Sequence, residues 1–255
     1  MRKDLRRAKA FISSFSFFVL TIGLIVALIC GMKYIYSTQG NSKMPIYKVD
    51  TEDKKVALTF DVAWGSDNME YIMKTLDKHN VKSTFFLVGS WIDDNKELVE
   101  KLDKKGHELS NHSNTHANMT KLSEEDIAKE IEVTTDKIYN ITGKKTDLYR
   151  PPFGDVDNEA MSICKSLGYK VIKWNIDSMD WKEIGPMHVT ERVIKGVEPG
   201  SIVLLHANVS DIEKYLDDII TILKKDGYEL VTISDLIYQD NYIIDSNGVQ
   251  KTIKK

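Results

Sequence analysis

Short apolar segments alternate with segments of helical periodicity between residues 54 and 238, and this alternation constrains the fold more than any other feature. Strands are predicted at 56–61, 83–88, 107–110, 147–150, 170–175, 201–206 and 229–233. Helices are predicted at 69–79, 95–105, 124–141, 158–167, 188–196, 211–225 and 234–238. About seven such units indicate parallel strands with helices outside them. A closed barrel and an open sheet both fit the pattern.

The composition is that of an ordinary folded protein, with 42% hydrophobic and 29% charged residues among 255. The formal net charge of −3 gives no reason to expect nucleic-acid binding. Cys30 and Cys164 are the chain's two cysteines, and only Cys164 falls in the predicted globular part. The fold therefore cannot depend on an internal disulfide. We expect a monomer.

The N-terminus pairs a basic head at residues 1–9 with an uncharged run, Ala10–Met32. The run has 23 residues, enough for a helix of about 34 Å, which exceeds the roughly 30 Å hydrocarbon core of a bilayer. A cleaved signal peptide is the alternative, but the run is long and no small-x-small site follows it. We expect one uncleaved transmembrane helix, with everything after Lys33 on the extracytoplasmic side of the cell membrane. Residues 33–53 are then a linker, 54–238 the globular domain, and 239–255 a C-terminal tail.

Polar side chains recur where the predicted strands end. Asp61 ends the first strand, His112 and His116 follow the third, and Arg150 ends the fourth. Asp177, Asp180 and Trp181 follow the fifth strand, and His206 ends the sixth. Because the carboxyl ends of parallel strands face the same way, these residues are predicted to meet in one cleft.

Their chemistry suits hydrolysis of a carbonyl compound. Two imidazoles four residues apart can hold one metal ion, although a lone H-x-x-x-H pattern is weak. Asp61 could be a general base or a further ligand, kept ionised by Arg150. His206, kept protonated by Asp177 or Asp180, would act as the general acid.

These motifs resemble those of the polysaccharide deacetylases, carbohydrate esterase family 4 with its NodB homology domain. The resemblance rests, in order, on Thr59–Asp61, His112–His116, Arg150–Gly154, Asp177–Trp181 and Leu204–His206. It implies a distorted (β/α)7 barrel and metal-dependent removal of N-acetyl groups from amino sugars.

The same resemblance implies a role for each site residue. Asp61 would be the base with Arg150 as its partner, and His206 would be the acid, oriented by Asp180. His112 and His116 would bind the metal. The groove for the sugar would be lined by Pro152, Phe153 and Trp181.

One position departs from the family pattern. The first motif of the family usually has two adjacent aspartates, the second a metal ligand, and here the second is Val62. We therefore expect a divalent metal, zinc or else cobalt or manganese, to be weakly held. Asp67 could replace the missing carboxylate if its loop folds back. The T-F-D-x-x-W-G variant is similar to the PdaB-like subgroup associated with spore formation.

Two functions follow from these features. The first is a membrane-anchored, wall-facing N-deacetylase whose partner is a cell-wall glycan, peptidoglycan or a chitooligosaccharide-like chain. The second is a non-catalytic glycan-binding or scaffold protein of the same fold, which Val62 favours. Cleavage of small amides is a third option that a membrane tether disfavours.

Overall fold

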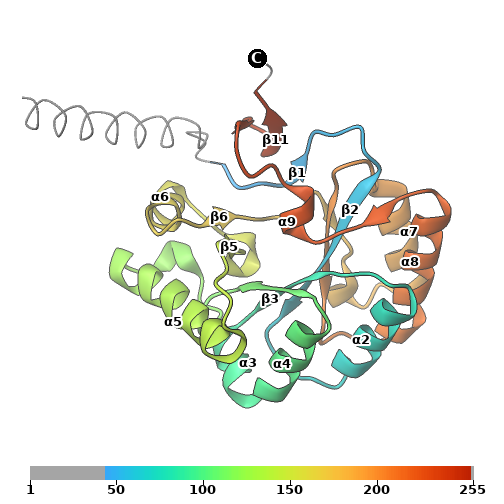
Figure 1. The fold of residues 1–255 in the computed structure, drawn as a ribbon, viewed down its shortest axis with the longest axis horizontal. Helices are drawn as coiled ribbons and strands as arrows, with labels where there is room; N and C mark the ends of the chain where they lie inside the picture. The colour runs from blue at the N-terminus through green and yellow to red at the C-terminus, as the bar shows by residue number, and fades with distance from the viewer. Residues whose placement is uncertain (1–43, 254–255) are drawn as a thin grey trace, which may run out of the picture. The chain divides into compact units, whose positions relative to one another are not determined.

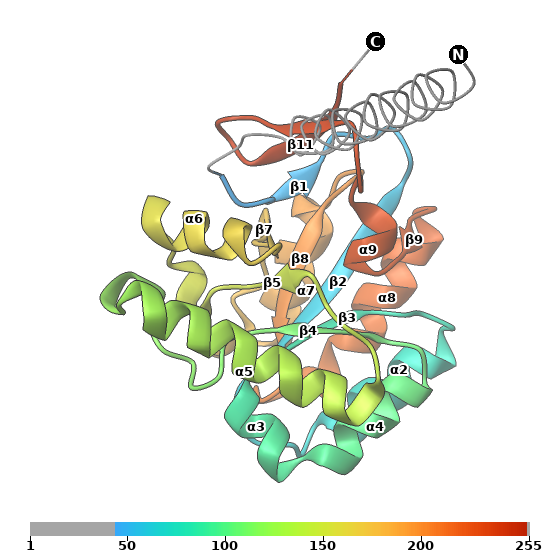
Figure 2. The ribbon, with the colours of Figure 1, turned by 60° about the vertical axis from the view of Figure 1, so that its left-hand side comes forward.

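The computed structural model describes residues 44–253. A curled sheet of parallel strands forms the centre, and the long helices surround its outer side (Figures 1 and 2). The spatial order in the eight-stranded sheet is β6-β5-β4-β3-β2-β8-β7, with β9 paired to β2, and all of its pairings are parallel. The predicted α/β class is confirmed, in the form of a partly closed barrel. Its strands are β2 (Lys55–Val62), β3 (Thr84–Leu87), β4 (Glu108–Asn111), β5 (Leu148–Tyr149), β6 (Lys170–Val171), β7 (Ile176–Asp177), β8 (Ile202–His206) and β9 (Glu229–Leu230).

Helices cover the sheet through apolar stripes, and most of them lie where the spacing of apolar residues predicts them. In α5, Ser123 caps the first turn by accepting from the Asp126 amide, and Gly143 ends the helix with a φ of 70°. The α-helices are α2 (Met69–Lys78), α3 (Gly89–Asp94), α4 (Lys96–Lys104), α5 (Glu124–Thr142), α6 (Asn158–Ser166), α7 (Pro186–Gly196), α8 (Leu216–Lys225) and α9 (Ile233–Leu236). Short 3-10 turns are η1 (Met119–Lys121), η2 (Pro152–Gly154), η3 (Asp180–Lys182) and η4 (Ile212–Lys214).

The barrel is distorted at the segment predicted as one strand over 170–175. Only its first two residues form a strand, β6, which pairs with β5. β7 begins after this segment, at Ile176, and pairs with β8 on the opposite edge of the sheet. The backbone of Ile46 enters the gap between these edges, accepting from the Lys173 amide and donating to the Val171 carbonyl. The N-terminal segment therefore takes part in closing the barrel.

A small second sheet joins the two ends of the described chain. β1 (Lys48–Val49) pairs in parallel with β11 (Val249–Thr252), which pairs antiparallel with β10 (Tyr242–Ile244). Figure 2 shows this sheet beyond the end of the barrel where β2 begins. The residues predicted only as a tail thus form a hairpin on the N-terminal segment.

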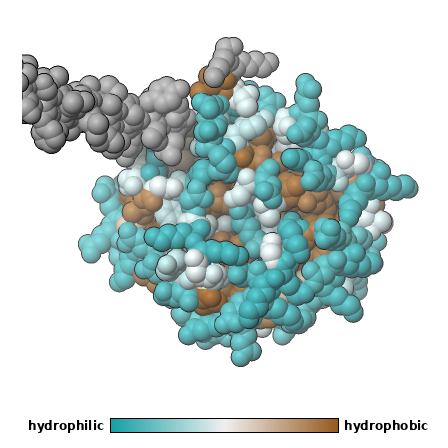
Figure 3. Space-filling model, viewed as in Figure 1, coloured by the Kyte–Doolittle hydropathy of each residue, from teal (hydrophilic) through white to brown (hydrophobic). Residues whose placement is uncertain are grey.

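The predicted strand over 229–233 is shorter than expected. Thr232 caps α9 by accepting from the Asp235 amide, so the chain turns helical at Ile233. Within residues 44–253 no helix has the length and apolar character needed to span a bilayer, and the predicted anchor lies outside this range. The face of the domain seen in Figure 3 is mostly hydrophilic, with small scattered apolar patches.

Candidate functional site

A pocket of about 530 Å³ opens at the carboxyl ends of the central strands. β2 and β8 are neighbours in a register that sets Asp61 beside His206. His112 comes directly after β4 and Arg150 directly after β5. The pocket is lined by Asp61, Ala63, Trp64, His112, His116, Phe153, Trp174, Asp177, Asp180, Trp181, Glu183, Leu204, His206, Asn208, Val209 and Ser210. Residues spread over nearly 150 positions of the chain therefore converge as the strand order predicts.

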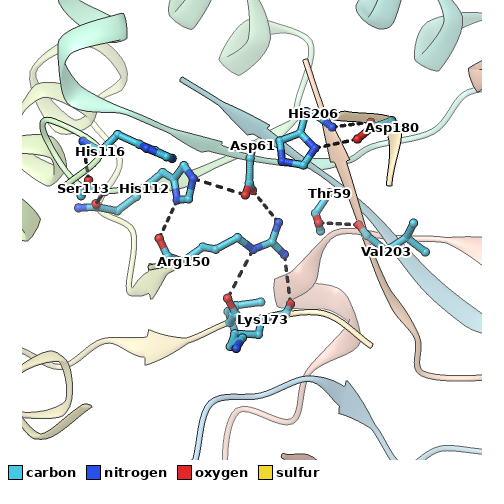
Figure 4. A network of polar contacts seen from close by, with 12 residues as sticks. Thr59, Asp61, His112, Ser113, His116, Arg150, Lys173, Asp180, Val203 and His206 are labelled. Atoms are coloured by element: carbon cyan, nitrogen blue, oxygen red, sulfur yellow. Dashed lines mark hydrogen bonds and ion pairs between the residues drawn. The ribbon is translucent and has the colours of Figure 1, made fainter. Parts of the chain in front are cut away.

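The Asp61 carboxylate is held from below by Arg150 (Figure 4). Arg150 Nη1 donates to Asp61 Oδ1 at 2.7 Å, and the guanidinium is fully buried against the Phe86 ring, 4.0 Å from its centroid. Burial alone would raise the Asp61 pKa, but the positive charges of Arg150 and His206 hold it below its ordinary value. Asp61 is therefore ionised at neutral pH.

His112 and His116 form one wall of the pocket. His112 Nδ1 donates to the Arg150 carbonyl at 2.7 Å, which turns Nε2 toward Asp61 Oδ2, 3.4 Å away. The two rings lie 5.0 Å apart, and the His116 ring also meets those of Trp64 and Phe153 edge to face. Burial lowers the pKa of both histidines, that of His116 to about 4. Both imidazoles are neutral at pH 7.

His206 stands on the other side of Asp61 and is bound by Asp180. Asp180 Oδ1 pairs with His206 Nδ1 at 2.8 Å, while Oδ2 accepts from the His206 amide at 2.9 Å and from the Tyr215 hydroxyl at 3.3 Å. Burial would lower the His206 pKa, but the hydrogen bond and charge of Asp180 raise it above its ordinary value. With Nδ1 occupied, Nε2 is the nitrogen free to deliver a proton.

The residues present do not complete a metal site. Within the described residues no group of three or more His, Cys, Asp or Glu side chains is placed to hold an ion. Val62 is fully buried in the apolar core, and Asp67 is exposed and does not line the pocket. Among residues 44–253, His112 and His116 are thus two imidazole donors without a third ligand.

Exposed aromatic rings form the rim of the pocket. Phe153 is 63% and Trp181 52% exposed, and Trp64, at 59%, joins them from the loop after β2. Pro152, predicted to share this role, is buried and does not line the pocket. Such rings around a polar pocket suit the apolar face of a sugar.

Sequence reasoning missed several residues of the site. Trp64 lies three residues after Asp61, in the loop that follows β2, so its position gave a signal that could have been used. Trp174 lines the pocket and stacks 5.5 Å from Arg150, although it was predicted only as part of a strand. Tyr215 and Asn208 had no recognisable signal, because neither lies in a motif.

Comparison with known proteins adds independent findings. The family model for polysaccharide deacetylase matches residues 48–172. Three bacterial relatives are similar in sequence. The peptidoglycan-N-acetylmuramic acid deacetylase PdaA of Bacillus subtilis is 34% identical over 76% of this chain and 75% of its own length. The uncharacterised YlxY of the same species is 34% identical over 76% of this chain and 60% of its own. The peptidoglycan-N-acetylglucosamine deacetylase PgdA of Listeria monocytogenes is 35% identical over 82% of this chain. The chain spans only 44% of PgdA.

Two solved structures show the same architecture. PdaA superposes with a TM-score of 0.72 at 33% identity, covering 76% of this chain and 85% of that one. BA3943 of Bacillus anthracis, described as a pseudoenzyme of carbohydrate esterase family 4, has a TM-score of 0.74 at 34% identity, covering 83% and 71%. With the family model, the relatives and the curled sheet in agreement, the chain belongs to the polysaccharide deacetylases, carbohydrate esterase family 4.

Proposed function

We propose that this chain is a peptidoglycan N-deacetylase that hydrolyses the N-acetyl groups of wall amino sugars. The observation that carries the proposal is the placement of an ionised carboxylate, Asp61, and a histidine of raised pKa, His206, on neighbouring strands of one pocket. Their opposite pKa shifts suit a base and an acid acting at the same pH. The relatives PdaA and PgdA, both named for peptidoglycan deacetylation, support the choice of substrate.

In the proposed reaction, Asp61 takes a proton from a water molecule, whose oxygen attacks the acetamide carbonyl carbon. His206 Nε2 then gives its proton to the amide nitrogen as the C–N bond breaks, releasing acetate and the free amine. Asp180 holds the imidazole through Nδ1 and stabilises its charged form. Trp64, Phe153 and Trp181 would hold the sugar ring over the pocket.

The test is acetate release by the purified full-length chain from N-acetylated muropeptides and chitooligosaccharides. We expect release from at least one substrate. A folded chain that releases no acetate from any substrate, with or without added zinc, cobalt or manganese, would contradict the proposal.

A glycan-binding protein without activity is the second candidate. Two observations favour it: Val62 leaves the histidine pair without a third donor, and a structural neighbour, BA3943, is described as a pseudoenzyme. Zinc titration by calorimetry separates the two candidates. Micromolar binding that His112→Ala abolishes would contradict the inactive scaffold, whereas undetectable zinc binding together with glycan binding and no acetate release would support it.

We further propose that the chain is held at the cell membrane, with its domain facing the wall. The proposal rests on the basic head and the uncharged run Ala10–Met32, and the T-F-D-x-x-W-G resemblance adds a role in spore formation. Carbonate extraction of membranes should leave the intact chain in the pellet, and protease added to protoplasts should digest the domain. Recovery of a shortened chain in the culture medium would overturn the anchor.

A further inference from the structure

The loop that carries both pocket histidines has an unfavourable backbone conformation at two residues. Residues 112–118 connect β4 to the 3-10 turn η1, and two of them, Ser113 and His116, have φ values of 68° and 58°. These values lie in the left-handed region, which residues with a Cβ rarely adopt. A loop with two such residues keeps its shape only when surrounding groups fix it.

Glu130, on the inner side of α5, supplies most of that support. Its Oε2 accepts from the amides of Asn114 and Thr115, both at 2.8 Å, and its Oε1 accepts from the Thr115 hydroxyl at 2.9 Å. Hydrogen bonds from backbone amides to a carboxylate are stronger than those between neutral groups. One half-buried side chain thus fixes the two residues between the left-handed positions.

Further contacts attach the same loop to α5 and α3. Lys137 of α5 donates to Asn114 Oδ1 at 2.9 Å and to the Gly89 carbonyl at 3.1 Å. Asn111 accepts from the Ser113 amide and donates to the Ile131 carbonyl of α5. A Cβ on Gly89 would approach Asn114 Oδ1 to 2.4 Å, so the fit between loop and helix is close. The histidine loop and α5 therefore form one unit.

We propose that Glu130 is the positioning residue of the site: it sets the angle at which His116 and His112 face Asp61, without touching the substrate. Glu130 does not line the pocket, and it reaches His116 only through the loop backbone. This inference rests on the proposed deacetylase function for its kinetic consequence, but its structural consequence is independent of activity.

The kinetic test compares Glu130→Ala and Glu130→Gln with Glu132→Ala and Glu132→Gln in the full-length chain. Glu132 is an exposed acid on the same helix, so its variants make the same chemical changes away from the loop. Glu130→Ala should lower kcat by about 10- to 100-fold, because the His112 ring, whose Nε2 lies 3.4 Å from Asp61 Oδ2, would shift with the loop. Glu130→Gln, which keeps an acceptor for the two amides, should recover most of the rate. Both Glu132 variants should behave like wild type.

The structural test uses NMR on the same five proteins. In Glu130→Ala we expect faster hydrogen exchange at the Asn114 and Thr115 amides and a shifted His116 ring signal, with the rest of the spectrum retained. If wild type is inactive, the proposed function fails and this readout still decides the role of Glu130. Equal exchange and equal His116 signals in the Glu130 and Glu132 variants would overturn the proposal. Should Glu130→Ala not fold, Glu130→Gln decides through the Thr115 amide, because a neutral oxygen accepts more weakly than a carboxylate. A Thr115 exchange rate in Glu130→Gln equal to that in Glu132→Gln would overturn the proposal.

Discussion

Asp61 and His206 lie on neighbouring strands of one pocket, and each is paired with a charged residue. Arg150 keeps Asp61 ionised, and Asp180 keeps His206 protonated. Burial of either residue without its partner would favour the neutral form, which is the wrong form for catalysis in both cases. The proposed chemistry therefore depends on two pairs of residues, Asp61 with Arg150 and Asp180 with His206.

The first prediction concerns pH. Because the base has a lowered pKa and the acid a raised one, kcat/KM should stay high down to below the ordinary aspartate pKa of 3.8 and fall only above the ordinary histidine pKa of 6.5. In Asp180→Asn the main group that raises the His206 pKa is gone and burial dominates, so the alkaline limb should move to lower pH.

A pH series of initial rates checks this prediction, with Asp77→Asn as the control, since that carboxylate pairs with Lys105 on the surface. The stability that the Asp180–His206 pair contributes should be complete below the unfolded histidine pKa and disappear as pH rises through the higher folded value. An alkaline limb that is identical in wild type and Asp180→Asn would show that His206 is not the acid.

The second prediction concerns the buried ion pair. Arg150→Met leaves the Asp61 carboxylate buried without its cation, so the free energy of unfolding should fall by about 3–5 kcal/mol. The double variant Asp61→Asn/Arg150→Met should recover part of this loss, because no unpaired charge remains. Denaturant unfolding measures both, with exposed Arg192→Met as the control. A loss in Arg150→Met no larger than in Arg192→Met would contradict the pairing.

At the scale of elements, the site is made by strand ends and the barrel is closed by segments far apart in the sequence. The sequence predicted that strand ends would make the site, because each predicted strand that ends in Asp61, Arg150 or His206 is followed by a predicted helix. It could not predict the closure of the barrel, since β1 and β11 are only two and four residues long and pair across some 200 positions. Nor could it show that the strand predicted over 170–175 would end at Val171, or that the chain would rejoin the sheet at Ile176 on its opposite edge.

The third prediction tests the contact of β1 with the barrel by comparing alanine substitutions at two glycines. Gly200 has a φ of 82°, and a Cβ there would lie 1.9 Å from the Val49 carbonyl oxygen; Gly168 has a φ of 85° and nothing within 4 Å. Gly168→Ala should therefore cost only the left-handed backbone penalty, about 1–2 kcal/mol. Gly200→Ala should cost about 3 kcal/mol or more, because β1 must move away.

Thermal or denaturant unfolding measures the loss of unfolding free energy in both variants. Hydrogen exchange at the Val49 amide, which donates to the Gly200 carbonyl, shows whether β1 has moved. Equal costs for the two alanine variants would show that the contact between β1 and the segment before β8 contributes little to the fold.

At the scale of the whole molecule, the small sheet of β1, β11 and β10 and the pocket lie toward opposite ends of the barrel. Lys48 of β1 pairs with Ser201 just before β8, whereas His206 at the end of β8 lines the pocket. The α/β architecture and most site residues followed from the sequence because parallel strands bring their carboxyl ends together whatever the loops do. The sequence did not predict that Trp64, and not Pro152, would line the rim of the pocket. The direction of a side chain in a loop depends on packing that one sequence does not reveal. The same limit applies to Tyr215 and Glu130, which act through residues of the motifs.

The most direct test of the account compares acetate release from N-acetylated peptidoglycan by wild type, Asp61→Asn and Asp67→Asn. Asp67 is exposed on the loop that follows Asp61, so its variant makes the same change outside the pocket. We expect Asp67→Asn to match wild type and Asp61→Asn to fall by about a thousandfold or more while remaining folded, since the base would be gone. Acetate release by folded Asp61→Asn at a rate within a few-fold of wild type would contradict the central claim that this carboxylate activates the water.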